Sequence, residues 1–493
     1  MAYMVYMAYI VELIKIARLR LANAGWSLQL ERFWEVVVRI GAQAEMIPGH
    51  VEFDVVDADG VFRAAPWFGT ALSVLAASGV RGVAVDVWWG LVEREPQCYC
   101  WAGYEQLFDL ITGKGLQIQV VMSFHACGGN VGDTAQIPLP AWVLQCGEHD
   151  PDLFFTDRPR EGAGRRNREY LSIWADEAAA LRGRTPLQCY EDFMQAFCNN
   201  FHQLLGSSLV DIVVGAGPCG ELRYPAYVES NGWKFPGVGE FQCYDRRALA
   251  CLAQAAREAG HPEWGYGGPH NAGDYASWPE DTDFFRVGGA WETEYGRFFL
   301  GWYSACLLRH ADQLLAIAKR LPPLPCCACS SDRSWWYRTR SHAAELTAGY
   351  YNTATHDGYA AILQVCARHS ARLTLTCVEM CDAQHAQHAQ CGPEGLLKQI
   401  RLLAARYAVP LAGENALPIF LAGGVDAVAL DRIVFNTRAC GLRSDSYADI
   451  VEPLPSLASF TLLRLGPELL LPSHQPPWLR FMTRMQQGGY VPC

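Results

Sequence analysis

The chain has 493 residues, of which 51% are hydrophobic and 18% charged, and its formal net charge is −11. This composition supports a large buried core and excludes wholesale disorder. The negative charge excludes general electrostatic attraction to nucleic acid or to an anionic membrane. No apolar run reaches the roughly 18 residues that a membrane span needs. We therefore expect neither nucleic acid nor a membrane as a partner, and the sequence leaves the oligomeric state open.

The cysteines and the N-terminal residues bear on the compartment. The 19 cysteines are odd in number and irregularly spaced, which is typical of reduced thiols inside a cell or organelle. Residues 1–24 resemble neither a secretory signal nor a transit peptide, because their basic residues follow the apolar run and they lack serine. We expect an intracellular protein, in a plastid or the cytoplasm. Helices are predicted at 5–22 and 27–40, so residues 1–45 form a divergent helical segment of unknown role.

The first elements of the main domain alternate between strand and helix. Residues 51–57 are a weak strand candidate, and the pattern of 67–77 predicts a helix that ends at Gly79. Residues 80–90 predict a buried strand that carries Asp86 near its end. A carboxylate inside an apolar strand is costly to bury unless another group binds it. Asp86 is therefore a candidate site residue.

The next strand leads into a polar loop. A helix is predicted at 103–113 and an apolar strand at 116–124. The following segment, His125–Asp133, places three glycines among His, Asn and Asp side chains. Such a segment is typical of a mobile loop over a site, and an ordinary turn is the simpler alternative.

A carboxylate follows the next buried strand directly. The apolar run 209–214 ends in a glycine-rich turn, and Glu221 comes immediately after that turn. In α/β barrels the chemistry lies just past the carboxyl ends of the parallel strands. The simpler alternative is that Glu221 caps the following helix, and its position alone does not decide between the two.

The rest of the chain continues the alternation. A long irregular excursion is expected at 263–282. Further helices are predicted at 140–144, 190–205, 246–259, 291–319, 395–407 and 425–436. Further strands are predicted at 372–380, 409–414 and 459–465, with a poor candidate at 326–331. With 51–57 counted, there are eight strands, the number that closes a (β/α)8 barrel. The sequence therefore predicts one α/β domain over 46–493, a TIM-type barrel with long βα loops at its C-terminal face.

Two glutamates at different strand ends indicate a reaction class. Glu221 and Glu414 can face each other across the barrel mouth, and paired carboxylates are the machinery of glycoside hydrolysis. A phosphate-binding loop and the serine-hydrolase pattern Gly-x-Ser-x-Gly are absent. The cysteines and histidines of 381–391 have metal-like spacing, but a solvated loop is the simpler alternative. We expect no metal or other cofactor.

Several long segments resemble plant-type β-amylases. Segments 125–133 and 217–227 are similar to the two signature motifs of that family. The matching segments occur in the family order, and the similarity runs from about residue 79 to about residue 470. The other matching segments are 85–90, 343–352, 376–380 and 413–418.

The resemblance implies an exo-acting, inverting α-1,4-glucan hydrolase that releases maltose from starch or maltodextrin. By position in the motifs, Glu221 would be the general acid and Glu414 the general base. The resemblance also assigns substrate-binding positions to Asp86, His125, Asp133, Cys329, Ser334, Thr376, Asn415, Ala416 and Arg464.

Two of these positions depart from the family. Cys329 and Ser334 stand where the family has Lys and His, which donate hydrogen bonds to substrate hydroxyls. Loss of a charge-assisted hydrogen bond costs about 1.5–3 kcal/mol, or roughly ten- to a hundredfold in rate if the transition state feels it. Two functions therefore stay open: an active β-amylase, and a catalytically weak or inactive relative that binds glucan or regulates starch breakdown.

Overall fold

A computed structural model describes most of the chain. It covers residues 35–40, 56–57, 60–128, 135–160, 162–321, 326–329, 342–421, 423–441, 454–487 and 491–492. The expected helix at 5–22, most of the weak strand at 51–57, and the candidate residues Asp133 and Ser334 lie outside these ranges.

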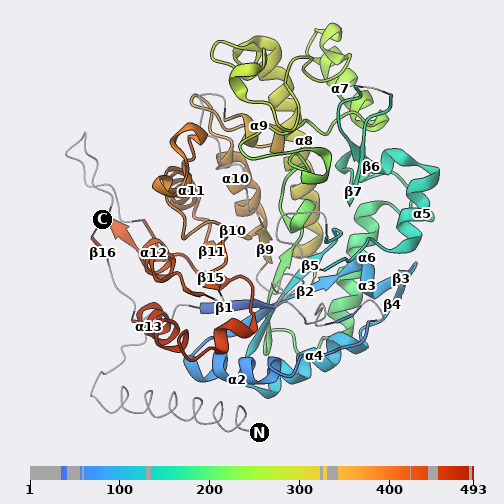
Figure 1. Ribbon diagram of the computed structural model, residues 1–493. Coiled ribbons are helices and arrows are strands. Elements are labelled where there is room, and N and C mark those ends of the chain that lie inside the picture. Colours follow the sequence, from blue (N-terminus) through green and yellow to red (C-terminus); the bar gives the residue numbers. More distant parts are fainter. Residues whose placement is uncertain are drawn as a thin grey trace.

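Eight parallel strands close into a barrel at the centre of the molecule (Figure 1). Every neighbouring pair, including the first and last strands along the chain, runs parallel. The (β/α)8 prediction is therefore confirmed. The strands in order around the barrel are β1 (Glu35–Ile40), β15 (Ser459–Leu462), β11 (Leu411–Glu414), β10 (Arg372–Leu375), β9 (Cys326–Cys329), β8 (Leu209–Val214), β5 (Gln117–Ser123) and β2 (Gly82–Trp88).

The first barrel strand is not the predicted one. β1 lies within the expected helix 27–40 and pairs with β15 and β2, so the helix prediction is wrong over 35–40. Three consecutive valines, at 36–38, favour a strand, but a fully buried strand is a continuous apolar run, which periodicity cannot separate from a buried helix. The barrel therefore starts before residue 46. Of the 51–57 candidate, the structure describes only Val56 and Asp57, with one isolated bridge from Val56 to Phe62.

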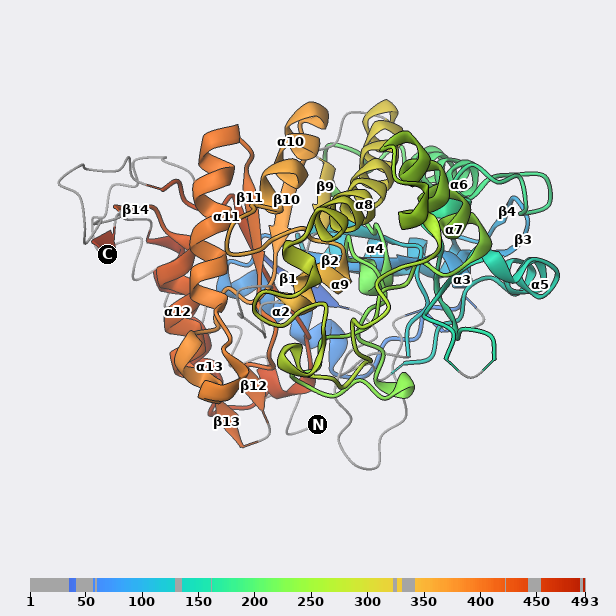
Figure 2. The same ribbon diagram turned by 90° about the horizontal axis from the view of Figure 1, so that it is seen from above.

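Helices surround the barrel (Figure 2). The longer ones are α2 (Phe68–Ser78), α4 (Ala102–Gly113), α6 (Pro186–Asn200), α7 (Arg246–Glu258), α8 (Glu294–Arg320), α10 (Tyr359–His369), α11 (Pro393–Tyr407), α12 (Ala427–Thr437) and α13 (Gln475–Gln486). Shorter ones are α3 (Trp89–Val92), α5 (Ala141–His149) and α9 (Ala343–Ala348). Sequence patterns did not predict α10 or α13. In the described part of the chain, no helix combines the length and apolar character needed to cross a membrane.

The C-terminal helix joins the two ends of the barrel domain. The indole Nε1 of Trp478 on α13 donates a hydrogen bond of 3.0 Å to the hydroxyl of Ser78, the last residue of α2. α2 itself ends at Gly79, whose φ of 91° is the left-handed conformation that glycine adopts without strain. This contact spans almost the whole sequence.

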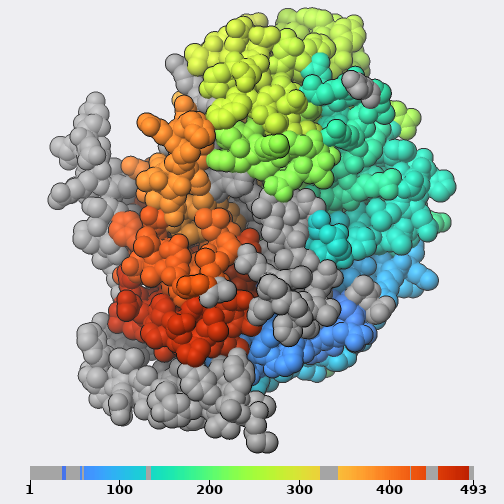
Figure 3. Space-filling view, in the orientation of Figure 1, coloured from blue at the N-terminus to red at the C-terminus, as the bar shows by residue number. Residues whose placement is uncertain are grey.

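Long βα loops extend from one end of the barrel and carry small hairpins of their own. The hairpins are β3 (Glu93–Glu95) with β4 (Cys98–Tyr99), β6 (Phe154–Thr156) with β7 (Arg166–Leu171), and β12 (Phe420–Leu421) with β13 (Gly424–Val425). A short parallel pair joins β14 (Cys440–Gly441) to β16 (Val491–Pro492). In the space-filling view the yellow-green segment that follows β8 covers the top of the molecule (Figure 3).

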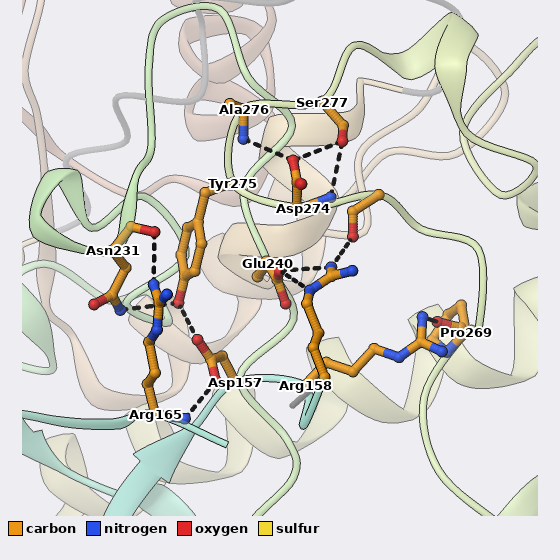
Figure 4. A network of polar contacts seen from close by, with 12 residues as sticks. Asp157, Arg158, Arg165, Asn231, Glu240, Pro269, Asp274, Tyr275, Ala276 and Ser277 are labelled. Atoms are coloured by element: carbon orange, nitrogen blue, oxygen red, sulfur yellow. Dashed lines mark hydrogen bonds and ion pairs between the residues drawn. The ribbon is translucent and has the colours of Figure 1, made fainter. Parts of the chain in front are cut away.

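A polar network joins the β6–β7 hairpin to the long segment after β8 (Figure 4). The hydroxyl of Tyr275 donates to the carboxylate of Asp157 at 2.9 Å and accepts from the amide of Asn231 at 3.1 Å. The guanidinium of Arg160 pairs with Glu240 at 2.7 Å. These contacts join the β6–β7 hairpin to two parts of the long segment after β8. Tyr275 thereby ties the irregular excursion to the β6–β7 hairpin.

Candidate active site

Glu221 lies at the carboxyl end of β8, after a single turn at Pro218–Gly220. Its side chain is buried, and the guanidinium of Arg223 donates a short hydrogen bond to it. Arg223 also donates to the carbonyl of Tyr224 at 3.2 Å. Because a buried charge is stable only when it is paired, this ion pair sets the position of the Glu221 carboxylate.

His125 and the Glu221 turn lie against each other. Gly220 has a φ of 77°, and a Cβ there would lie 3.4 Å from the imidazole of His125. Glycine thus suits both the backbone conformation and the close approach. The other side of His125 meets Trp88, with ring centroids 5.0 Å apart. The ends of β2, β5 and β8 therefore converge here.

Glu169 was missed by the sequence analysis. Its carboxylate accepts a hydrogen bond of 2.8 Å from the backbone N–H of Cys219, and its carbonyl accepts one of 2.7 Å from Ala126. It lies on β7, far from either strand end in sequence. No local pattern links one glutamate on a hairpin to two distant loops.

Glu414 is the last residue of β11, and its side chain is buried. Burial raises the pKa of its carboxyl to about 7, because a low-dielectric environment disfavours the charged form. The negative charges of Asp86 and Glu221 also raise this pKa, and the positive charges of Arg39 and Arg464 lower it. Glu414 therefore lies within electrostatic range of the other acidic candidates.

Asp86 has partners that the sequence analysis missed. Arg39 on β1 forms two hydrogen bonds with its carboxylate, and Ser123 at the end of β5 donates a third at 2.9 Å. Ser123 and Asp86 are buried, and Arg39 is partly buried. The positive charge of Arg39, on the neighbouring strand, therefore compensates the buried carboxylate of Asp86.

Side-chain hydrogen bonds hold the segment after Glu414 against the end of β15. The amide of Asn415 donates to the carbonyl of Leu417 at 2.9 Å and accepts from the N–H of Leu463 at 2.7 Å. The carbonyl of Ala416 accepts from Arg464 at 2.7 Å. The structure thus brings Asn415, Ala416 and Arg464 together beside Glu414.

Glu379 stabilises the same segment from below. Its carboxylate accepts the backbone N–H groups of Ala416 and Leu417, both at 2.8 Å. Burial raises the pKa of Glu379. Glu345 similarly accepts from Asn352 at 2.8 Å and interacts with His342 at 3.0 Å. Both glutamates thus bind neighbouring groups.

The remaining candidates are placed only in part. Thr376 follows β10, with its hydroxyl 3.3 Å from the thiol of Cys377. Cys329 is the last residue of β9 and pairs with Thr374 in the barrel. Asp133 and Ser334 lie outside the described residues.

The metal-like spacing of 381–391 does not translate into a metal site. Within the ranges that the structure describes, no three His, Cys, Asp or Glu side chains are grouped so that they could hold a metal ion. Trp89 is fully buried against Phe124, Trp142 and Tyr190, so it packs the core.

A parallel barrel with two buried glutamates past different strands at its C-terminal end is the arrangement of a barrel glycoside hydrolase. A search of protein-family models matches residues 50–448 to glycosyl hydrolase family 14. The chain is 49% identical over 424 residues to β-amylase 1, chloroplastic, of Arabidopsis thaliana, covering 85% of this chain and 71% of the relative. It is 43% identical over 436 residues to β-amylase of Glycine max, covering 87% and 85%.

A solved structure agrees with these relatives. The catalytic domain of β-amylase from Paenibacillus polymyxa superposes with a TM-score of 0.70 and 26% identity, covering 92% of this chain and 99% of that domain. The chain belongs to glycosyl hydrolase family 14.

Proposed function

We propose that this protein is a β-amylase that hydrolyses α-1,4-glucosidic bonds of starch and maltodextrins from the non-reducing end and releases β-maltose. Family membership over residues 50–448 supports the reaction class. The observation that carries the proposal is that two glutamates, Glu221 and Glu414, are both buried past two different barrel strands, and that the charge of Glu221 acts on the carboxyl of Glu414. Nothing in the proposed reaction requires a metal or other cofactor.

The proposal gives Glu221 the role of general acid and Glu414 that of general base. The acid protonates the leaving glycosidic oxygen while the base removes a proton from water on the opposite face of the sugar. An inverting pair needs roughly 6.5–9.5 Å between carboxyls to admit that water. A base must be ionised, and the positive charges of Arg39 and Arg464 act in that direction on Glu414.

Burial acts in the opposite direction. With a pKa of about 7, Glu414 holds its proton more firmly than an ordinary glutamate, whereas Glu221 carries an ion pair with Arg223. This raised pKa opposes the assignment of Glu414 as the base. The roles therefore rest on motif position and call for a direct test.

The test compares Glu221→Gln and Glu414→Gln on two substrates. Both variants are expected to lose maltose release from maltodextrin by roughly 10²–10⁴-fold, the usual contribution of a general acid or base. Maltosyl fluoride carries a leaving group that needs little protonation, so Glu221→Gln should retain its hydrolysis and Glu414→Gln should not. The opposite pattern would reverse the roles. Full starch hydrolysis by both variants would overturn the proposed site. The control is Glu258→Gln on the surface of α7, which should hydrolyse starch as the wild-type protein does.

A catalytically weak relative is the second candidate, and one observation favours it. Both carboxylate oxygens of Asp86, a proposed substrate-binding residue, accept hydrogen bonds from Arg39. Cys329 and Ser334 replace stronger donors of the family at two further positions. The wild-type protein would then bind starch but release maltose no faster than the Glu221→Gln variant. That result would decide for this candidate.

The preferred location is a plastid. The Arabidopsis relative and a 48% identical relative from Oryza sativa, β-amylase 2, are both named chloroplastic. Starch as the substrate supports the same compartment. Fractionation of cells that express the full gene, followed by immunodetection in purified plastids, tests this location.

A further inference from the structure

Two cysteine thiols meet between α7 and α8, away from the glutamates. Cys251 on α7 is partly exposed, whereas Cys306 on α8 is buried at 5% exposure. The indole of Trp302 on α8 contacts the Sγ of Cys251, and Cys306 follows Trp302 by one helical turn, so both thiols lie in the same gap between the helices. Figures 1 and 2 show the two helices on the outer side of the molecule. The pair thus combines one thiol within reach of solvent and one behind it.

The surroundings of the pair favour a thiolate on the outer sulfur. The indole Nε1 of Trp302 donates to the Sγ of Cys251 at 3.4 Å, and Arg309 donates to the Sγ of Cys306 at 3.7 Å. Interaction with Cys306 lowers the pKa of Cys251, and interaction with Cys251, together with burial, raises the pKa of Cys306. A thiolate is the nucleophilic form of cysteine.

Two other buried cysteines, Cys198 and Cys366, have a different environment. Burial alone raises the pKa of Cys198 to about 11, and burial is the main reason that the pKa of Cys366 rises to about 12. Such thiols are inert. They provide internal controls within the same molecule.

We propose that Cys251 and Cys306 are a redox-active dithiol that forms a reversible disulfide between α7 and α8. An accessible thiolate beside a second thiol that can resolve it is the arrangement of a redox-active cysteine pair. The oxidant is a small disulfide of the glutathione type. This assignment does not depend on the glycosidase reaction.

The chemistry balances in two exchanges. The thiolate of Cys251 attacks one sulfur of the oxidised small disulfide, breaks its S–S bond and releases one small thiolate. The sulfur of Cys306 then attacks Cys251 in the mixed disulfide and releases the second small thiolate. The two protons of the cysteines end on the two released thiols. The protein pair is oxidised by two electrons, and the small disulfide is reduced by two.

The test titrates the full chain in buffers of oxidised and reduced glutathione, blocks the remaining thiols with an alkylating agent, and maps the peptides by mass spectrometry. We expect a peptide that crosslinks 251 to 306 and lacks two hydrogens, lost again on reduction. Cys251→Ser should remain unmodified at 306. Cys306→Ser should stop at the mixed disulfide on Cys251. Cys198 and Cys366 should stay reduced throughout.

Two results would overturn the proposal. One is glutathione on Cys251 with a free thiol at Cys306 in the wild-type protein, since the second exchange would then not occur. The other is no modification of Cys251 under conditions that oxidise an added peptide dithiol. A rise in thermal midpoint on oxidation, absent in both serine variants, checks the crosslink independently, because a disulfide restricts the unfolded chain.

Discussion

Arg39 on β1 donates two hydrogen bonds to the carboxylate of Asp86 on β2, one of 3.0 Å from Nε and one of 2.6 Å from a terminal nitrogen. This fork matches the two carboxylate oxygens, the geometry that favours arginine over lysine. The same guanidinium lowers the pKa of Glu414. One residue of the first strand therefore both positions one acid and influences the charge of another.

Replacing Arg39 tests these two effects separately. In Arg39→Lys the charge remains and the fork is lost, so the pH profile should stay while the free energy of unfolding falls by about 1.5–3 kcal/mol. In Arg39→Met the charge is also lost, so the pKa of Glu414 should rise. If Glu414 is the base, the acidic limb of kcat/KM then moves to higher pH. Measured kcat/KM from pH 4 to 9 checks this.

The control for Arg39 is Arg81→Met. Arg81 pairs with Gln117 in an exposed position and should leave the profile unchanged. Identical profiles for Arg39→Met and wild type would show that this guanidinium does not influence the reacting carboxyl.

Glu414 should also make stability depend on pH. Its pKa is raised by burial from 4.5 to about 7, so between these values the folded state binds more protons than the unfolded one. Stability then falls as pH rises through this window. Glutamine does not ionise, so Glu414→Gln avoids the cost of a buried charge. Its free energy of unfolding at pH 8 should exceed that of wild type by about 1–3 kcal/mol.

Urea unfolding at pH 4.5 and pH 8 measures this difference. We expect the variant and wild type to be closest at the lower pH. If the free energies of unfolding of variant and wild type differ equally at both pH values, the effect is not due to ionisation of Glu414.

Glu379 should matter for both stability and turnover. Its carboxylate accepts two backbone N–H groups next to Glu414, and charged acceptors contribute about 1.5–3 kcal/mol each. Glu379→Gln keeps one amide oxygen but loses the charge, so we expect a loss of a few kcal/mol and a lower kcat. Thermal unfolding and maltose release measure the two effects.

Glu394→Gln is the matched control for Glu379. Glu394 also accepts a backbone N–H, that of Asp382 at 2.9 Å, but in an exposed position. Water can replace the lost hydrogen bond there, so this variant should behave as wild type. Equal effects of the two substitutions would exclude a special role for the buried acceptor.

Local sequence determined much of the barrel. The runs 209–214 and 80–90 are apolar and β-rich, and the structure has β8 and β2 there. The glutamates at strand ends could be placed because parallel strands all present their carboxyl ends on one side. The family motifs added the residues between them.

Tertiary structure decided the rest, for two physical reasons. The three buried valines of β1 show no alternation, so only the pairing of β1 with β2 and β15 distinguishes it from a helix. Long-range partners carry no local pattern: Arg39 reaches Asp86, Glu169 reaches Cys219, and Cys251 meets Cys306 only because the barrel brings their strands, loops and helices side by side. The residue types were present in the sequence, but packing decided which of them form ion pairs and hydrogen bonds with each other.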